Sequence, residues 1–458
     1  MENNLPEQFV KNLLEVMPQS EIEEFKSAIS RESIVSLRTN PYKNIIKEGD
    51  KVAWCETGTY LDERAQFTLD PNLHGGGYYV QEASSMFLEQ LFKQVILKEL
   101  GDEIAVLDLC AAPGGKSTHI SSLVGLKSLV VANETISSRS KILEENIIKW
   151  GLGNVIVTSS DPKQFGNLTH SFDVLSIDAP CSGEGMFRRV NDAVNQWSAS
   201  NVELCVQRQR RIISDSFNSL KEGGFLIYST CTFNKKENEE NLAWVSENFD
   251  VEPIDISIED SWGVVKTITD GINGFRFYPH KCKGEGMFIS IMRKKECGES
   301  SRIVQRKNYK SRYVVAVSKE QKELATWIKD SESFTYIKNE KGIVKMFNKN
   351  YIELFKNLEQ YVKIIYEGVE LGQFFKSDFK PSHPLALYVG ANFEKNVPIV
   401  YVPKEMALDF IRKKDIDCSI FEIGINLVSY ENLPLGFIKR IGNRCNNLYP
   451  KEFRIVNL

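Results

Sequence analysis

LDLCAAPGGKSTH, residues 107–119, contains the end of an apolar run, a glycine turn and the start of a helical pattern. Pro113, Gly114 and Gly115 permit a tight turn in which the backbone passes close to a ligand, and the amino end of a helix favours polar or anionic groups. A P-loop would need a glycine at position 110, where this sequence has Cys110, so a nucleotide triphosphatase is disfavoured. The stretch therefore predicts a small-molecule site between a strand and a helix.

Short apolar runs alternate with amphipathic runs on both sides of this turn, from residue 101 to residue 294. The alternation predicts an α/β fold with a mainly parallel sheet. We expect strands at residues 104–109, 128–134, 154–160, 172–178, 224–230 and 286–294. We expect helices at residues 116–123, 137–150, about 201–220 and 236–247. In such sheets, ligands bind beyond the carboxyl ends of the strands, near the point where the strand order switches.

Composition limits the classes to which the chain can belong. With 458 residues, 42% of them hydrophobic and 26% charged, it is expected to be a globular protein of two to four domains. No apolar run reaches the roughly 18 residues of a membrane helix, and the start MENNLPEQFV lacks both parts of a signal peptide, so we expect a cytoplasmic protein with no membrane partner. Nine cysteines without a CxxC pair indicate neither a disulfide framework nor a metal site.

Charge gives only local indications. The net charge of −4 carries no global signature of a nucleic-acid-binding protein. Two segments nevertheless concentrate positive charge, at residues 301–312 and from residue 436 to the end. For each segment by itself, a solvated surface is the better explanation.

Two acidic residues end the strands that follow the glycine turn. Glu134 ends the second strand 20 residues after Gly114, which is the place of an acid that binds ribose hydroxyls in a nucleoside-binding fold. Asp161 ends the third strand and is a candidate for the adenine amino group, although an Asp-Pro pair is as often a plain turn.

Two cysteines and an aspartate lie beyond the ends of the next two strands. The fourth strand runs into DAPCSGEGMFRR, residues 178–189, and the fifth into STCT, residues 229–232. If these strands are neighbours, Cys181 and Cys231 face one substrate beside Asp178. A single buried cysteine is usually an inert apolar side chain, but two at the ends of strands that flank a ligand pocket favour a chemical role.

The source of positive charge for a reactive thiolate stays open. Lys116 and Arg188 are both candidates, since a nearby cation lowers the pKa of a thiol. The alternatives are that Lys116 binds phosphate and that Arg188, with Arg189, is surface charge.

Together these strings resemble the bacterial rRNA cytosine-5 methyltransferases of the NOL/NOP/Sun family, and most closely its RsmF group. Within the expected α/β core, the resemblance rests on CAAPGGKS (110–117), ANE (132–134), SDP (160–162), DAPCSGEGMF (178–187) and STCT (229–232). Outside that core it extends to LRTNP (37–41), YYVQEASSM (78–86), KPSH (380–383) and GNRCNNLYPK (442–451).

The resemblance implies S-adenosylmethionine as cofactor and assigns a role to each motif residue. Cofactor contacts are implied for Cys110, Ala111, Ala112, Pro113, Gly114, Gly115, Lys116, Glu134, Asp161 and Asp178. Cys231 is implied as the nucleophile, Cys181 as the residue that assists its release, and Asp178 as a further catalytic residue. The residues alone do not rank the two thiols, because DNA cytosine methyltransferases use the cysteine of a Pro-Cys motif.

Such a reaction needs a thiol and an acid together. Carbon 5 of cytosine is a poor nucleophile, but a thiolate added to carbon 6 turns the ring into an enamine that attacks an electrophilic methyl group. Asp178 would hold ring nitrogen N3 and the amino group. A second thiol or another base would help to remove the carbon 5 proton and expel the first cysteine.

The resemblance also implies a domain organisation: an α/β, Rossmann-like class I methyltransferase core between a small α+β N-terminal domain and a C-terminal PUA-like β-rich domain. We place an N-terminal RNA-binding domain at residues 1–95, the methyltransferase domain at 96–297, a linker and intermediate domain at 298–375 and the PUA-like RNA-binding domain at 376–458. The expected partner is RNA, as 16S rRNA or the small ribosomal subunit. We expect a monomer without metal.

RNA contacts outside the pocket would offset the cost of flipping a cytosine out of its stack. The candidates are Arg38, Asn40, Arg208, Arg210, Arg211 and the two basic segments, with Tyr78 and Tyr79 either stacking on a base or packing in a core. Two other interpretations stay open: a methyltransferase that acts on DNA or a small molecule, and an RNA-binding assembly factor without turnover.

Overall fold

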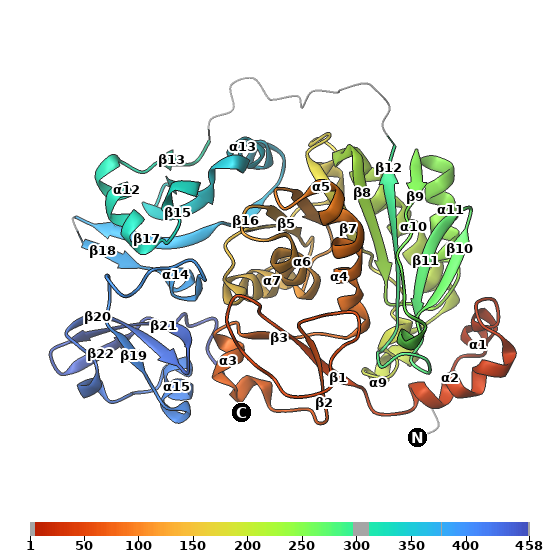
Figure 1. Cartoon of the computed structure of the whole chain (residues 1–458), viewed down its shortest axis with the longest axis horizontal. Coiled ribbons are helices and arrows are strands. Elements are labelled where there is room, and N and C mark those ends of the chain that lie inside the picture. Colours follow the sequence, from red (N-terminus) through yellow and green to blue (C-terminus); the bar gives the residue numbers. More distant parts are fainter. Residues whose placement is uncertain (1–4, 296–310, 377, 457–458) are drawn as a thin grey trace.

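A ten-stranded sheet forms the centre of the molecule in a computed structural model that describes residues 5–295, 311–376 and 378–456 (Figure 1). The strand order is β10-β11-β12-β8-β7-β4-β5-β6-β16, and β9 pairs with β12 outside this path. Most of the predicted linker lies outside the described residues, and with it most of the first basic segment.

Five parallel strands make up the middle of this sheet, at the positions predicted from the apolar runs. They are β4 (Ala105–Asp108), β5 (Leu129–Asn133), β6 (Val155–Thr158), β7 (Phe172–Asp178) and β8 (Leu220–Thr230). Neighbouring residues of one strand enter apolar clusters on opposite faces of the sheet, as Val106 and Leu107 do. Because both faces are buried, the strands appear in the sequence as unbroken apolar runs.

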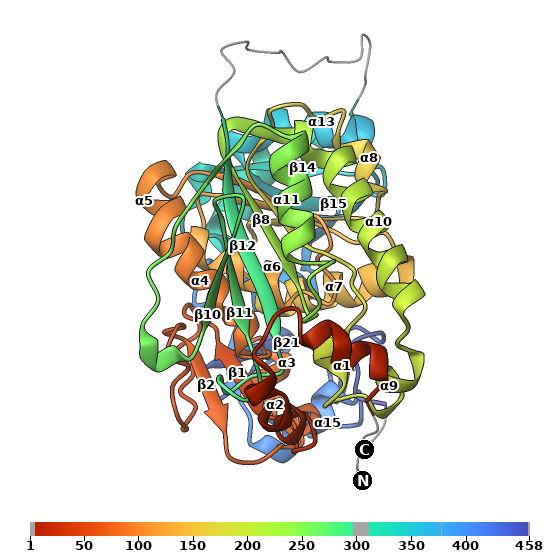
Figure 2. The same ribbon diagram turned by 90° about the vertical axis from the view of Figure 1, so that its right-hand side faces the viewer.

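Helices cover both faces of these strands. Residues of α6 (Gly115–Val124) and α7 (Ser137–Trp150) pack in the cluster on one face, and residues of α10 (Ala199–Ser216) and α11 (Glu239–Asn248) pack in the cluster on the other. The view in Figure 2 shows α10 and α11 side by side along the sheet. The helix predicted at residues 137–150 has the bounds of α7.

The strand order reverses beside β4. The chain passes from β4 to β5 and β6 on one side, and β7 then pairs with β4 on the other side. The carboxyl ends of β4 and β7 therefore flank the crevice where such folds bind ligands. Beyond β8, β12 (Met287–Lys294) runs antiparallel to both of its neighbours.

Four strands of the central sheet were not predicted. Three lie on the β12 side, namely β9 (Val251–Pro253), β10 (Val265–Thr269) and β11 (Ile272–Phe277). The fourth, β16 (Ile364–Glu367), pairs antiparallel with β6 and brings Ile364 opposite Thr158. A strand from the segment assigned to an intermediate domain thus completes one edge of the methyltransferase sheet.

The N-terminal part has a helical hairpin, a small sheet and a helical connection to the core. The hairpin consists of α1 (Glu7–Leu13) and α2 (Ile22–Ile29), and the antiparallel sheet has β1 (Val35–Thr39) between β2 (Gly58–Leu61) and β3 (Tyr78–Val80). The short helices are α3 (Pro71–His74), α4 (Leu88–Leu91) and α5 (Leu97–Leu100). Aromatic residues of the hairpin pack against Phe187 and Phe233, so the hairpin rests on the loops that follow β7 and β8.

The C-terminal part holds two further sheets (Figure 1). The first has the order β13-β14-β15-β17-β18, with strands at Val314–Val315, Phe334–Lys338, Ile343–Asn348, Val369–Phe375 and Asp378–Pro381. It is accompanied by α12 (Ser318–Leu324), α13 (Ile352–Tyr361) and α14 (His383–Leu387). The second sheet contains β19 (Ile399–Tyr401), β20 (Gly424–Tyr430), β21 (Leu433–Ile441) and β22 (Arg444–Asn447), with α15 (Lys404–Ile411). Because β17 pairs with β18, the first sheet continues across residue 376.

Candidate active site

The glycine turn lies directly after β4, at the crevice. Gly114 has φ of 115°, a conformation that favours glycine, and α6 begins at the next residue. This turn brings Lys116 into the first turn of α6, so its side chain reaches the ends of the neighbouring strands.

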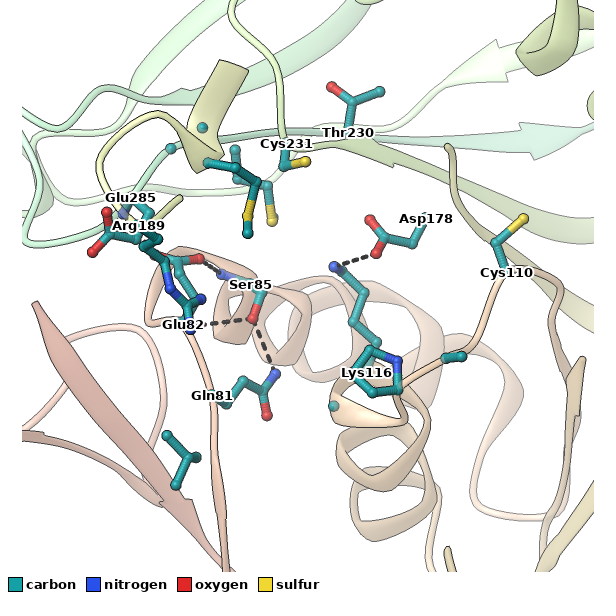
Figure 3. Close-up of a pocket in the computed structure, with 18 of the residues that line it drawn as sticks. Gln81, Glu82, Ser85, Cys110, Lys116, Asp178, Arg189, Thr230, Cys231 and Glu285 are labelled. Carbon is teal, nitrogen blue, oxygen red and sulfur yellow. Dashed lines mark hydrogen bonds and ion pairs between the residues drawn. The ribbon is translucent and has the colours of Figure 1, made fainter. Parts of the chain in front are cut away.

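A cavity of about 380 Å³ opens between this turn, the ends of β7 and β8, and the N-terminal sheet (Figure 3). Of the predicted site residues, its lining contains Cys110, Ala111, Ala112, Pro113, Gly115, Lys116, Asp178 and Cys231. The volume lies within the roughly 300–1,000 Å³ typical of small-ligand sites.

One wall of the cavity had not been predicted. Gln81, Glu82 and Ser85 line it from the segment after β3, and Arg189 and Glu285 line it from the core. The wall is cross-linked, because Gln81 Nε2 donates to Ser85 Oγ at 3.1 Å and Glu82 Oε1 accepts from the Glu285 amide at 3.0 Å. The motif YYVQEASSM pointed to this segment, but no sequence spacing showed that it would line the cavity at the strand ends.

The two cysteines meet at the ends of β7 and β8. Cys181 Sγ and Cys231 Sγ are 3.1 Å apart, and both thiols are free. Cys231 lines the cavity, whereas Cys181 is not among its lining residues. The sulfurs therefore share one site, with Cys231 towards the open space.

Lys116 and Asp178 form an ion pair beside the sulfurs. Lys116 Nζ lies 2.9 Å from Asp178 Oδ2, and Ser229 Oγ donates to Asp178 Oδ1 at 2.9 Å. Burial lowers the pKa of Lys116, but the charge of Asp178 and the Cys231 sulfur outweigh burial and raise that pKa overall. Lys116 is thus a fixed cation that acts on both the carboxylate and Cys231.

The two thiols differ in their surroundings. The hydrogen bond with Cys231 and burial together hold the pKa of Cys181 well above its ordinary value, and the negative charge of Glu237 adds to this effect. Cys181 therefore keeps its proton and can donate it to the Cys231 sulfur.

The two predicted cofactor acids lie at the ends of β5 and β6, outside the cavity lining. Glu134 is buried, accepts from the Ile136 amide at 2.8 Å and lies 3.3 Å from Arg139. Asp161 caps the next short helix by accepting from the Lys163 amide at 3.1 Å, and it pairs with Arg211 at 3.3 Å.

Arg188 is not the cation of the reactive site. Its guanidinium donates to the Ala28 carbonyl at 2.6 Å and to the Gly284 carbonyl at 3.2 Å, and it pairs with Glu285 at 3.6 Å. It therefore holds the N-terminal hairpin on the core, while its neighbour Arg189 faces the cavity.

Two predicted RNA contacts are buried. Arg38 has none of its surface exposed, donates to Gln81 Oε1 at 2.9 Å and Thr118 Oγ1 at 2.7 Å, and stacks over Trp150. Asn40 is 1% exposed and donates to two backbone carbonyls. Both predictions were wrong, because these side chains join the N-terminal sheet to α6 and α7 and present nothing to an RNA.

The other RNA candidates have mixed environments. Arg208 is exposed on α10, whereas Arg210 donates to Asn241 and lies over Trp244. Tyr78 is buried and donates to Asp70, so it is a core residue. Tyr79 lines the cavity.

Cys55, Glu89 and His119 form a cluster of potential metal ligands away from the cavity, with ligand atoms all within 4.8 Å of one another. Lys93 already pairs with Glu89 at 2.8 Å, and Nδ1 of His119 has no acceptor, whereas a metal-bound imidazole usually donates its second N–H. Hydrogen bonds account for the group without an ion.

Models of known protein families match three parts of the chain. Residues 94–293 match the model described as 16S rRNA methyltransferase RsmB/F. Residues 5–83 match the N-terminal domain of 16S rRNA methyltransferase RsmF, and residues 397–455 match the methyltransferase RsmF PUA domain.

Curated relatives match over nearly the whole length. A ribosomal RNA small subunit methyltransferase F of Photobacterium profundum is 30% identical, with 99% of this chain and 98% of the relative covered. One of the same description from Shewanella piezotolerans is 30% identical, with 94% and 93% covered.

Solved structures share the fold. A methyltransferase homologue protein from Pyrococcus horikoshii superposes with a TM-score of 0.51 at 26% identity, covering 63% of this chain and all of its own. NSun6 from the same organism, solved with SFG, gives a TM-score of 0.53 at 20% identity and covers 64% of this chain and 98% of its own.

In the part of the chain that the structure describes, no helix is long and apolar enough to cross a membrane.

Proposed function

Because the chain belongs to the RsmF family of S-adenosylmethionine-dependent rRNA methyltransferases, we propose that it methylates carbon 5 of a cytosine in 16S rRNA through a covalent Cys231 adduct. The observation that carries this proposal is the 3.1 Å approach of two sulfurs beside the Lys116–Asp178 pair in one cavity.

The residues around the glycine turn suit the cofactor. Buried Glu134 accepts one backbone hydrogen bond and has an arginine nearby, yet a carboxylate offers about four lone-pair sites, so acceptor capacity remains for ribose hydroxyls. We assign cofactor contacts to the turn Cys110–Lys116, to Glu134 and Asp161, and to Asp178. When bound, S-adenosylmethionine supplies an electrophilic methyl group.

Cys231 is the proposed nucleophile. It faces the cavity, it interacts with the cation of Lys116, and the protonated Cys181 lies next to it. The Cys231 sulfur bonds to carbon 6 of cytosine, and the electron pair of the carbon 5–carbon 6 double bond becomes available at carbon 5.

Asp178 orients the base. Its carboxylate is held by Lys116 and Ser229, so it is fixed before the substrate enters. We propose that it binds the edge of the ring that carries N3 and the amino group, where charge changes during the addition.

Release completes the reaction. The carbon 5 proton leaves to a base, the carbon 5–carbon 6 double bond forms again, and the Cys231–carbon 6 bond breaks. Cys181 is the proposed helper because its sulfur lies next to the departing one.

The test is methyl transfer from labelled S-adenosylmethionine to 16S rRNA and to small ribosomal subunits, with DNA as the comparison. Cys231→Ala is expected to abolish labelling, and Cys181→Ala to accumulate a protein–RNA adduct that migrates slowly on a denaturing gel. Cys418→Ala, far from the cavity in the C-terminal sheet region, is the matched control. Full activity of Cys231→Ala would refute the assignment, and label on DNA alone would refute the substrate.

A further inference from the structure

Two buried carboxylates join the loops that carry the sulfurs. Glu184 follows Cys181 by three residues, and Glu237 follows Cys231 by six. Their exposed fractions are 1% and 0%. Burying a carboxylate is costly unless it is hydrogen-bonded, so the groups that bind these two carboxylates matter.

Each carboxylate accepts hydrogen bonds from the loop of the other cysteine. Glu184 Oε2 accepts from the amides of Phe233 at 2.7 Å and Asn234 at 3.0 Å. Glu237 Oε2 accepts from the amide of Ser182, the residue after Cys181, at 3.0 Å. We call Glu184, Asn234 and Glu237 the clamp, because Asn234 Nδ2 donates to Glu184 Oε1 at 3.0 Å and to Glu237 Oε1 at 2.7 Å.

Helix α10 supports the clamp from behind. Gln209 Nε2 donates to Glu237 Oε2 at 2.7 Å and to the Pro180 carbonyl at 3.1 Å. The residues on both sides of Cys181 are therefore tied to Glu237, directly or through Gln209. The loops are also joined by the Gly185 amide, which donates to the Cys231 carbonyl at 2.8 Å.

Charge distinguishes the two sulfurs. The hydrogen bond with Cys231 and burial raise the pKa of Cys181 most, and the negative charge of Glu237 adds to them. The positive charge of Lys116, paired with Asp178, lies instead beside Cys231. Glu237 therefore affects Cys181 in two ways: it fixes the backbone beside Cys181, and its charge opposes a negative charge on the Cys181 sulfur.

We infer that Glu237 is a positioning residue that selects Cys231 as the nucleophilic sulfur and keeps Cys181 as its proton-bearing partner. It does so by holding the backbone on both sides of Cys181 and by opposing negative charge on that sulfur. The inference rests on the proposed function for the identity of the reaction, but the selection between the sulfurs can be measured without RNA or cofactor.

The experiment is alkylation of the full chain by iodoacetamide at about pH 8 and 9, with the rates at the Cys181 and Cys231 peptides quantified by mass spectrometry. In the unsubstituted protein, Cys231, which lines the cavity, is expected to react faster than Cys181. Glu237→Gln preserves the shape and removes the charge, and it is expected to increase the Cys181 rate about tenfold, because lowering a pKa by about one unit gives about ten times more thiolate at a pH below that pKa. Loosening of the fold would increase both rates and lower the melting temperature, so the increase must be confined to Cys181.

Glu240→Gln is the matched control, since Glu240 is exposed at the start of α11, three residues after Glu237, and it is expected to leave both rates unchanged. An unchanged Cys181 rate in Glu237→Gln overturns the inference. If that variant does not fold, the unsubstituted protein decides the matter, because faster alkylation of Cys181 than of Cys231 overturns the inference as well. A faster Cys181 reaction in a chain that methylates no rRNA would refute the proposed function and leave the role of Glu237 intact.

Discussion

The two halves of the strand-end crevice are built differently. In the half proposed to bind the cofactor, at the ends of β5 and β6, the acids Glu134 and Asp161 bind backbone amides and arginines of their own surroundings. In the half proposed to be reactive, at the ends of β7 and β8, the two sulfurs contact each other and Asp178 pairs with Lys116. We call these the cofactor half and the reactive half.

This difference shows which half of the crevice is held more rigidly. Groups that must meet within a few tenths of an ångström during a reaction are held by neighbours that are themselves buried and hydrogen-bonded. A cofactor that enters and leaves at every turnover needs hydrogen-bond acceptors that remain accessible, rather than a rigid binding site. We therefore expect substitutions in the reactive half to lower the rate and those in the cofactor half to weaken cofactor binding.

The largest expected effect concerns Asp108, which ends β4 between the two halves. Burial raises its pKa from the ordinary 3.8 to about 7, with the Ser117 hydrogen bond acting in the opposite direction. The folded state then binds a proton that the unfolded chain has released, so stability falls as the pH rises from about 4 to about 7, by about 4 kcal/mol in all.

Asp108→Asn removes that dependence and retains an acceptor for Ser117. Thermal unfolding at several pH values measures this. Between about pH 5 and 8 the unsubstituted protein loses stability through Asp108, so the difference in melting temperature, variant minus unsubstituted, is expected to increase. Asp102→Asn, on the exposed segment before β4, serves as the control. Parallel curves for Asp108→Asn and the unsubstituted protein would contradict the prediction.

A somewhat smaller effect is expected in the reactive half. Asp178→Asn removes the charge that holds Lys116 and is expected to lower kcat for methyl transfer by about 10²–10³-fold. Cofactor affinity is expected to fall by less, about tenfold, because Asp178 is only one of the proposed cofactor contacts. Single-turnover labelling of 16S rRNA and isothermal titration with S-adenosylmethionine measure the two quantities. Asp192→Asn, exposed on α9 (Asn191–Gln196), is the control. If the variant lost methyl-transfer rate and cofactor affinity to the same extent, the expected difference between the reactive half and the cofactor half would be wrong.

The smallest effect belongs to the cofactor half. Glu134→Gln keeps one acceptor oxygen and is expected to raise the Kd for S-adenosylmethionine about tenfold, the cost of roughly one charged hydrogen bond, with kcat at saturation nearly unchanged. Titration calorimetry and saturation kinetics test this, with the exposed Glu103→Gln as control. A fall in kcat at saturating cofactor would show that Glu134 belongs with the reactive groups.

Local patterns predicted the middle of the fold well. The apolar runs gave β4 to β8, and the pattern at residues 137–150 gave α7 with its bounds, because both depend on burial that repeats along the chain. Because β7 and β8 are neighbouring parallel strands, the motifs that follow them lie side by side, and this brings Cys181 and Cys231 together.

Other features depend on partners distant in the sequence. Arg38 was a candidate RNA contact, yet it is enclosed by Gln81, Thr118 and Trp150. Likewise, the clamp of Glu184 and Glu237 follows no spacing rule, since its hydrogen bonds cross between loops about 50 residues apart. Such contacts are visible only when the chain is folded.

The pairing of β16 with β6 ties the C-terminal half to the sheet of the methyltransferase core. The ladder places Ile364 opposite Thr158, in the same sheet whose strand ends carry Cys181 and Cys231. The C-terminal half is therefore held in a fixed position relative to the two sulfurs. A chain cut after residue 295 would lose this pairing and leave β6 as an unpaired edge, open to pairing with foreign strands.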